Sequence, residues 1–294
     1  MKDKSVVFLY EVEPHPVHEA WAESVDADFQ EIHPGWKGFL DPKSFKMRKY
    51  DIVFCEDGYS MRLAAFQKAL GAKFKIFRLI GTAGHYNLAE KGISLKGEIW
   101  ASKKVDGAIA ISEWIKGYAE PYFNCEIEVV NPFISEEKYH KLGKLDYTSG
   151  TGKIVFVGRH WKKEGSRKGL DLIEDAMKIM EEKGYDLQVL SVGNRGEKIE
   201  YDTNIKDLGY VEDEELLDLF EEAELFLQPS RRDGWSVAVL EAMRSGTPPV
   251  VSENVGSKEM VNKLDGELVS DLNSESLAES IKYFLDKKAD EKQK

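Results

Sequence analysis

Short apolar runs alternate with stretches of helical spacing along most of this chain, and this alternation restricts its fold more than any other feature. The runs SVVFLYEV, DIVFCE and KIVFVG have the length and the Val, Ile and Phe content of buried strands. Residues 60–70, 168–183 and 237–245 have the apolar spacing of helices. Strands that are apolar on both faces and separated by helices predict an α/β fold, in which helices cover both faces of parallel sheets.

The alternation continues through both halves of the chain and is interrupted once. Residues 138–153 are polar, rich in Gly, Ser and Thr and poor in aliphatic side chains, so we interpret them as a linker. A chain of 294 residues is also long for one domain. We therefore predict two Rossmann-like domains, residues 1–145 and 146–294. Further expected strands are FKIFRLIG, GAIAIS, EIEVVN, LQVLSVG, LFLQPS, PPVVS and GELVS, and further expected helices are residues 112–118, 213–222 and 274–287.

Composition excludes several classes of protein. The net charge of -12 argues against a general nucleic-acid binder, which would more usually be basic. Cys55 and Cys125 are far apart and lack CxxC spacing, which excludes a disulfide framework and a Cys-rich zinc site. No stretch approaches the roughly 18–20 apolar residues of a membrane span, and the first apolar run is too short for a signal peptide. We expect a cytoplasmic protein.

Two local patterns imitate ligand motifs. The SGTGK run of residues 149–153 lacks the P-loop spacing, because Tyr147 stands where a glycine is required and a strand follows the run instead of a helix. Asp26 and Asp28 form an Asp-x-Asp triplet, which in some transferases holds a divalent metal, but we interpret them as solvated turn residues. No His-x-x-x-His pair is present, so we expect no metal site.

Two cations follow the first strand of the second half. Gly158 and Arg159 end the run KIVFVG-R, and Lys168 precedes the next helix. The glycine lets a ligand approach the backbone, and the arginine presents a planar fork to phosphate oxygens. Amide dipoles at a helix start also favour anions. Because open α/β sheets bind ligands at the carboxyl ends of their strands, we expect these residues to bind a diphosphate.

A later segment adds two carboxylates. Asp233 and Glu241 are separated by seven residues in PSRRDGWSVAVLEAM. If a helix begins near Ser236, Asp233 lies in the loop before it and Glu241 about a turn and a half inside. One acid can then reach a sugar ring and the other a ribose, while the bare amides between them face phosphate. Gly193, which follows another strand, and Val211 suit a base-binding wall.

In this order, the motifs resemble the retaining nucleotide-sugar glycosyltransferases of family 4, which have the GT-B fold. The resemblance covers about residues 153–287 and rests on GR, KG, VG, PS-x-x-D-G-x-S, the later glutamate, GTP and VG-x-x-E. It implies two Rossmann-like domains facing a cleft, with the acceptor domain first and the nucleotide-sugar domain second. The terminal helix is a candidate to pack back on the first domain. The implied reaction moves a hexosyl group from a nucleotide-diphospho-sugar to a saccharide or lipid-linked acceptor, with retention and without an essential metal.

The resemblance also implies residue roles by position. Arg159 and Lys168 would stabilise the departing diphosphate, Asp233 would face the transferred sugar, and Glu241 would bind the ribose hydroxyls. His85, in a loop after an expected strand, takes the place of a histidine that the family often has near the sugar. Donor contacts would come from Gly158, Gly193, Val211, Gly234, Trp235, Ser236 and Val237.

The sequence departs from the family at three places. Asp233 stands where the family has a glutamate and is one methylene shorter, Ser236 replaces a frequent glycine, and Glu13–His18 replaces a glycine-rich loop. These departures leave open a catalytically silent sugar-nucleotide-binding subunit. A phosphorylase or an epimerase with the same fold is also left open.

Basic side chains outnumber acidic ones between residues 43 and 78. This local charge suits either a solvated face or peripheral contact with an anionic membrane at the inner face of the cell. The basic residues are Lys43, Lys46, Arg48, Lys49, Arg62, Lys68, Lys73, Lys75 and Arg78.

Overall fold

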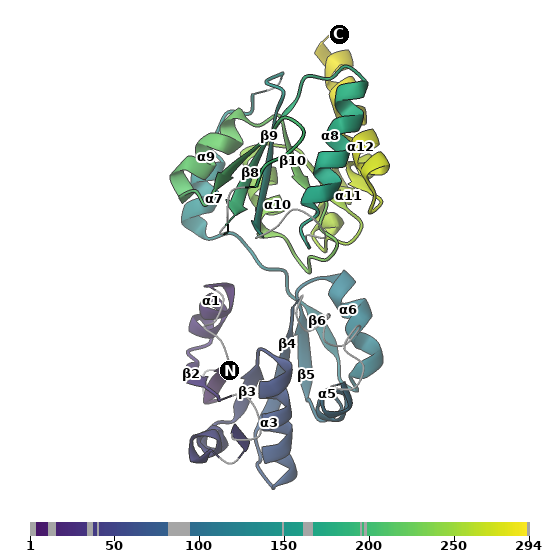
Figure 1. Cartoon of the computed structure of the whole chain (residues 1–294). Helices are drawn as coiled ribbons and strands as arrows, with labels where there is room; N and C mark the ends of the chain where they lie inside the picture. The colour runs from purple at the N-terminus through teal and green to yellow at the C-terminus, as the bar shows by residue number, and fades with distance from the viewer. Residues whose placement is uncertain are drawn as a thin grey trace. The chain divides into compact units, whose positions relative to one another are not determined.

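The computed structural model describes residues 4–10, 16–33, 38–39, 41–81, 95–148, 150–160, 167–194, 196 and 199–292. The chain forms two compact units, Met1–Pro132 and Phe133–Lys294, each built on a parallel sheet of six strands (Figure 1). The division after Pro132 lies ahead of the 145/146 boundary that we expect from the sequence.

The first unit has strand order β2-β1-β3-β4-β5-β6, and the paired strands are all parallel. Phe8 and Leu79 pack with Val6, Ile52 and Ala22 in a buried cluster. The strands are β1 (Val6–Tyr10), β2 (Asp28–Glu31), β3 (Ile52–Cys55), β4 (Lys75–Ile80), β5 (Gly107–Ala110) and β6 (Ile127–Val129). The helical elements are α1 (Pro16–Ser24), η1 (Pro42–Lys49), α3 (Gly58–Ala69), α5 (Leu95–Ser102), α6 (Glu113–Ala119) and η3 (Glu120–Tyr122).

The second unit has strand order β12-β11-β10-β7-β8-β9. Its strands are β7 (Lys153–His160), β8 (Gln188–Asn194), β9 (Ile205–Gly209), β10 (Leu225–Gln228), β11 (Pro249–Ser252) and β12 (Val269–Ser270). Its helical elements are α7 (Glu136–Leu142), α8 (Leu170–Glu182), α9 (Asp213–Glu222), α10 (Val237–Ser245), α11 (Lys258–Leu264), η4 (Gly266–Leu268) and α12 (Ser274–Lys292).

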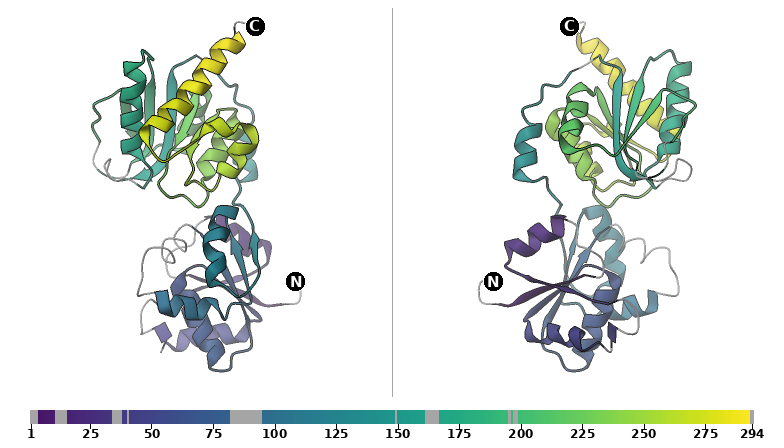
Figure 2. Two further views of the ribbon diagram at one scale, coloured as in Figure 1. Left: turned by 90° about the vertical axis from the view of Figure 1, so that its right-hand side faces the viewer. Right: turned by 60° about the vertical axis from the view of Figure 1, so that its left-hand side comes forward.

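Helices cover both faces of the second sheet, as its apolar strands require. Figures 1 and 2 show α8 and α12 together over one face and α7, α9 and α10 over the other. Phe156, Phe220 and Phe226 are fully buried in the core between these layers. The predicted α/β class with Rossmann-like sheets is confirmed.

The order of the second sheet reverses at β7. Chain order runs outward from β7 through β8 to β9 on one side, and then resumes with β10, β11 and β12 on the other. The carboxyl ends of β7 and β10 therefore meet at the topological switch point, where open parallel sheets bind their ligands. The β7–β8 register also shifts between Val157 and His160, at Gly158 and Arg159.

The structure corrects the expected linker. Residues 138–142 belong to α7, whose start is capped by Ser135, and Leu142 is fully buried in the second core. Most polar side chains of this short helix face solvent, so its composition resembles that of a linker. Beyond α7, Gly150 and Gly152 bond through their amides to the Glu224 carboxylate, which ties residues 150–152 to the strand start of β10.

Candidate functional site

An ion pair joins two of the sequence-predicted residues at the switch point. Lys168 Nζ lies 2.6 Å from Asp233 Oδ2, and the two side chains are 12% and 9% exposed. Lys168 precedes α8, and Asp233 lies in the loop after β10. The fold thus brings a cation and a carboxylate 65 residues apart in sequence to one edge of the sheet.

Gly158 and Gln228 make room for the lysine and orient it. A β-carbon at Gly158 would lie 3.2 Å from both Cγ and Cδ of Lys168, so the glycine lets the lysine stem cross β7. The buried Gln228 amide satisfies its polar atoms when its nitrogen donates to the Val157 carbonyl and its oxygen accepts from Lys168 Nζ, both at 3.1 Å. The ammonium group is thereby held on two sides.

The turn before α8 depends on a glycine. Gly169 has φ +77°, and a β-carbon there would lie 2.1 Å from the Pro229 carbonyl oxygen. Arg231 then joins the loop after β10 to α8 by a bidentate pair with Asp171, at 2.7 and 2.6 Å. These contacts fix the positions of the two loops that carry Lys168 and Asp233 relative to each other.

Asp233 is also fixed from the opposite side. Its amide donates to the Asn254 carbonyl at 3.0 Å, and its carbonyl accepts from the Gly256 amide at 2.8 Å. These bonds form a one-residue parallel bridge to Val255. Glu259 follows in the first turn of α11. The loop that carries Asp233 is therefore attached to both α8 and the segment after β11.

Two helix starts point amides to the same edge. Among the described residues, no side chain caps α8, which starts after Gly169, or α10, which starts after Ser236. The first amides of a helix without such a cap can bind an anion. Gly234, Trp235 and Ser236 are buried ahead of α10, and Val237 is half-buried at its start.

Glu241 has a partner that the sequence did not suggest. Its Oε1 lies 2.8 Å from Lys138 Nζ, and the two side chains are 10% and 20% exposed. Lys138 also bonds Asp213, at 3.1 Å, at the start of α9. Burial by itself lowers the pKa of Lys138, but Glu241 and Asp213 raise it above its ordinary value. The helical signature of α7 was present in the sequence: Ser135 precedes two acids and a basic last turn.

Gly193 and Val211 lie at the carboxyl ends of neighbouring strands. Gly193 has φ +102° in β8, and Val211 is buried just after β9. Buried Asp207 accepts from Asn194 Nδ2 at 2.6 Å and from the Gly209 amide at 3.0 Å. This network fixes the two strand ends side by side. It lies on the same sheet edge as the Lys168–Asp233 pair.

Two predicted side chains fall outside the described parts of the chain. Arg159 is placed in β7 by its backbone, but its side chain is not described. His85 belongs to residues 82–94, which are not described. The roles assigned to these two residues stay predictions, as do the roles of the other candidate residues.

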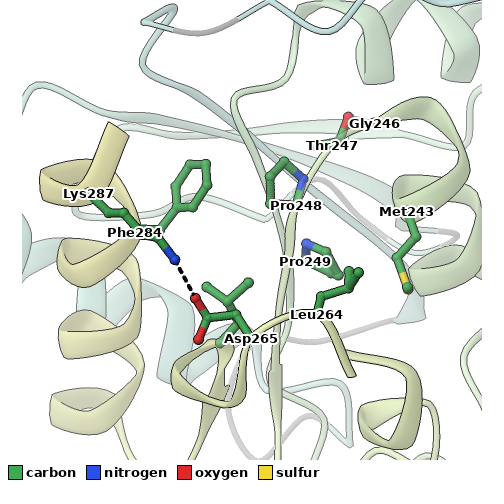
Figure 3. Close-up of a pocket in the computed structure, with 10 residues that line it drawn as sticks. Met243, Gly246, Thr247, Pro248, Pro249, Leu264, Asp265, Phe284 and Lys287 are labelled. Carbon is green, nitrogen blue, oxygen red and sulfur yellow. Dashed lines mark hydrogen bonds and ion pairs between the residues drawn. The ribbon is translucent and has the colours of Figure 1, made fainter. Parts of the chain in front are cut away.

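A cavity lies at the other edge of the second sheet, apart from the Lys168–Asp233 pair. The cavity has a volume of about 290 Å³ (Figure 3). Pro249 lines it and begins β11, so the cavity lies at the amino ends of the strands, away from Lys168 and Asp233. Its rim includes the Asp265–Lys287 ion pair, 2.8 Å long. The lining residues are Met243, Gly246, Thr247, Pro248, Pro249, Leu264, Asp265, Leu268, Phe284 and Lys287.

The described ranges hold neither a candidate metal cluster nor a candidate membrane span. No group of three or more His, Cys, Asp or Glu side chains is placed there to hold a metal ion. No described helix has the length and apolarity to cross a membrane. Asp26 lies in an exposed turn with φ +51°, and Asp28 begins β2.

Part of the chain is similar in sequence to known glycosyltransferases. Residues 151–287 match the family described as Glycosyl transferases group 1. The chain is 25% identical to an uncharacterized glycosyltransferase of Methanocaldococcus jannaschii, over 95% of this chain and 75% of that protein. It is 26% identical to the GDP-mannose-dependent monoacylated alpha-(1-6)-phosphatidylinositol monomannoside mannosyltransferase of Corynebacterium glutamicum, over 55% of this chain and 45% of that protein.

A solved structure supports the fold. Alr3699/HepE of Anabaena, crystallised in complex with UDP, superposes with a TM-score of 0.69. The alignment covers 96% of this chain and 90% of that one, at 15% sequence identity. Identity this low shows a shared fold alone. The two six-stranded parallel sheets are those of GT-B proteins.

Proposed function

We propose that this chain, which matches the Glycosyl transferases group 1 family over residues 151–287 and has the GT-B fold, transfers a hexosyl group from a nucleotide-diphospho-sugar with retention of configuration. The acceptor would be a saccharide or a lipid-linked glycan. The second unit would bind the donor, and the first would receive the acceptor. The domain match over residues 151–287 supports the transferase class.

The Lys168–Asp233 pair is the observation that carries the donor site. At 2.6 Å, the carboxylate neutralises a nearly buried ammonium group at the switch point. A donor diphosphate, guided by the amides of α8 and α10, would take over Lys168 as its counterion. Arg159, one residue after Gly158, would add a second cation. Asp233 would then be released toward the sugar hydroxyls.

We assign Asp233 to sugar binding rather than to a covalent step. In front-face transfer, the bond from the sugar anomeric carbon to phosphate breaks, the acceptor oxygen bonds on the same face, and its proton passes to the leaving phosphate. Lys168 and Arg159 would stabilise the charge that develops on this phosphate. His85 would contact the sugar. Retention distinguishes this mechanism from direct inversion.

The remaining donor contacts follow from positions on the same edge. Glu241 would bind the ribose hydroxyls, while Gly193 and Val211 would line the base. Backbone near Gly158 and the start of α10 would contact the phosphates, with side-chain or main-chain contacts from Gly234, Trp235, Ser236 and Val237. We propose no essential metal, because the cations and the helix starts supply the positive charge.

A nucleotide panel tests the donor site. Thermal unfolding would be followed with UDP, GDP, ADP, dTDP and CDP in the presence of EDTA. One nucleotide is expected to stabilise the protein by about 2.7 kcal/mol at a hundredfold excess over its dissociation constant. Arg159→Ala should lose this stabilisation, whereas Lys178→Ala, on the exposed side of α8, should keep it.

The product then tests the reaction. With the matching nucleotide-sugar and an acceptor series, NMR should show a glycosidic product of the donor's anomeric configuration and release of the nucleoside diphosphate. An inverted product would contradict retention. Nucleotide binding without any transfer would favour the catalytically silent subunit. Release of a sugar phosphate would favour a phosphorylase, and an epimerised nucleotide-sugar would favour an epimerase.

We propose peripheral membrane contact through fewer basic residues than the sequence suggested. Arg78 is buried and Lys68 pairs with Asp106, so these two residues do not join a basic face. η1 is different: Phe45 is 40% exposed, and the Arg48 guanidinium lies 5.2 Å from its ring centroid. Three lysines of the same element are also exposed: Lys43, Lys46 and Lys49.

An aromatic ring among cations is suited to an anionic lipid surface. Co-sedimentation with vesicles of phosphatidylglycerol should exceed that with phosphatidylcholine. Lys46→Glu with Lys49→Glu should abolish the excess. The charge-matched control Lys73→Glu with Lys75→Glu, outside η1, should retain it. Equal binding by both double variants would contradict a role for η1.

A further inference from the structure

Helix α7 is attached to α10 by several independent contacts. Lys138 pairs with Glu241, and Arg244 Nε donates to the Tyr139 carbonyl at 3.1 Å. The Arg244 guanidinium also lies 4.1 Å from the Tyr139 ring centroid. Leu142 is fully buried in the core of the second unit. α7 therefore has a defined position on the helix that carries Glu241 (Figure 1).

Lys138 connects two parts of the sheet edge. Its ammonium group contacts Glu241 on α10 at 2.8 Å and Asp213, two residues after Val211, at 3.1 Å. The proposed function assigns Glu241 to the ribose and Val211 to the base. One side chain from outside all the sequence motifs thus joins the two ends of the proposed nucleoside site.

The burial of this contact gives it an energetic consequence. The Glu241 side chain is 10% exposed, so its charge is largely removed from water. A carboxylate in such a place needs a partner, and without one it would turn toward solvent. Asp213 is 80% exposed and can be solvated without Lys138. Loss of Lys138 should therefore affect Glu241 more than Asp213.

We propose that Lys138 is a positioning residue for ribose recognition: it holds Oε1 of Glu241, which leaves Oε2 to accept a hydrogen bond from a ribose hydroxyl. This inference rests on the proposed function. Among the described residues, Lys138 is the partner found for the Glu241 carboxylate. A lysine that merely attached α7 to α10 would support folding but would not affect the choice between ribose and deoxyribose.

The dependence of nucleotide affinity on the ribose hydroxyls distinguishes a positioning role of Lys138 from a role in folding alone. Calorimetric titration would compare the nucleoside diphosphate that binds the wild type with its 2′,3′-dideoxy counterpart. A hydrogen bond to a charged group corresponds to a preference of about tenfold or more for the ribonucleotide. Lys138→Met should bring this preference close to one by weakening ribonucleotide binding, with dideoxynucleotide binding nearly unchanged. Lys138→Arg should recover part of the preference.

Lys141→Met is the matched control. Lys141 lies on the same helix, is 46% exposed and pairs with Glu137 at 2.9 Å, so its loss removes the same charge without touching Glu241. Its ribose preference should equal that of the wild type. If the Lys138→Met protein does not fold, Lys138→Gln replaces it in the test. Glutamine keeps a hydrogen-bond donor on a shorter side chain, so this variant should show an intermediate ribose preference.

A double-mutant cycle completes the test. In a Glu241→Ala background the ribose preference is already lost, and Lys138→Met should cause no further change. A Lys138→Met protein that keeps the full ribose preference would overturn the positioning role while the donor site stands. A wild-type protein that binds no nucleoside diphosphate would overturn the proposed function and this inference with it.

Discussion

The two sheets use a buried cation at their carboxyl edges in different ways. In the first unit, Arg78 of β4 is 4% exposed and donates to the carbonyls of Cys55 (3.0 Å), Glu56 (2.5 Å) and Leu79. In the second, Lys168 meets a carboxylate at 2.6 Å. Both sheets are parallel and six-stranded, so the architecture alone does not decide what a charge at this edge does.

The partners explain the difference. Backbone carbonyls bound by Arg78 are part of the fold, and no ligand can replace them without opening the ends of β3 and β4. Burial lowers the pKa of Arg78 from its ordinary value, while Asp57 and other nearby charges oppose that shift. Lys168 is held by the Asp233 side chain, which in the proposed function turns away when a donor phosphate binds. A replaceable partner is what makes a buried cation available to a ligand.

Removing the replaceable pair should have the largest effect. Lys168→Met is expected to lower kcat/KM by roughly 10²- to 10³-fold, because a preorganised charge at the leaving group is lost. Steady-state kinetics with the identified donor would measure it, with Lys178→Met on α8 as control. Lys168→Met combined with Asp233→Asn should regain stability but not activity. Recovery of activity in the double variant would contradict the assignment.

Arg78→Met should sharpen the contrast by affecting stability instead. Three carbonyls near the strand ends lose their donor, which is expected to cost about 2–4 kcal/mol of unfolding free energy. Urea denaturation would measure the loss. Nucleotide affinity of the folded protein should stay at the wild-type value. A large fall in affinity with little loss of stability would show that Arg78 belongs to a binding site.

Gly169→Ala tests how the second edge is held. Its φ of +77° and the 2.1 Å approach to the Pro229 carbonyl combine backbone strain with a clash. We expect a loss of about 2–4 kcal/mol. Gly184→Ala is the matched control, because Gly184 has φ +85° with nothing within 4 Å of the added carbon. Its loss should be about 1 kcal/mol. Equal losses of unfolding free energy in the two variants would show that the clash with the Pro229 carbonyl does not contribute.

The exposed Asp265–Lys287 pair should show the smallest effect. The hydrogen bond between the two side chains is the main cause that lowers the pKa of Asp265. The same hydrogen bond raises the pKa of Lys287 to about 12. The pair's contribution is therefore present at neutral pH. This contribution is lost as the pH falls through the pKa of Asp265, which lies below its ordinary value of 3.8. It is also lost as the pH rises through the Lys287 pKa of about 12.

Lys287→Met should slightly lower the unfolding free energy at neutral pH, since an exposed ion pair contributes little. The difference from the wild type should shrink as the solution is acidified below the ordinary carboxyl pKa. Urea denaturation across that range would measure it. A difference that stayed constant with pH would assign the effect to the packing of Lys287 beside Tyr283 instead of to its charge.

Much of this architecture follows from local signals. The helices over residues 213–222 and 237–245 are found as predicted, because each has apolar residues at helical spacing, and Gly246 ends the second. The motif residues Lys168 and Asp233 were placed at strand ends from the sequence, but their ion pair was not predicted. Strand β9, with the sequence IKDLG, is not among the expected strands, since only its pairing with β8 distinguishes it from a loop.

By itself, the sequence determined that parallel sheets form and which chemical groups stand at their strand ends, because periodicity and spacing are local properties. Tertiary structure decided the partners of those groups. It placed Lys138 against Glu241 and Asp171 against Arg231, and it turned Arg78 inward onto carbonyls. Pairing between side chains far apart in sequence depends on strand order and on which helix faces meet. Neither the strand order nor the contact between helix faces can be predicted from a local pattern of residues.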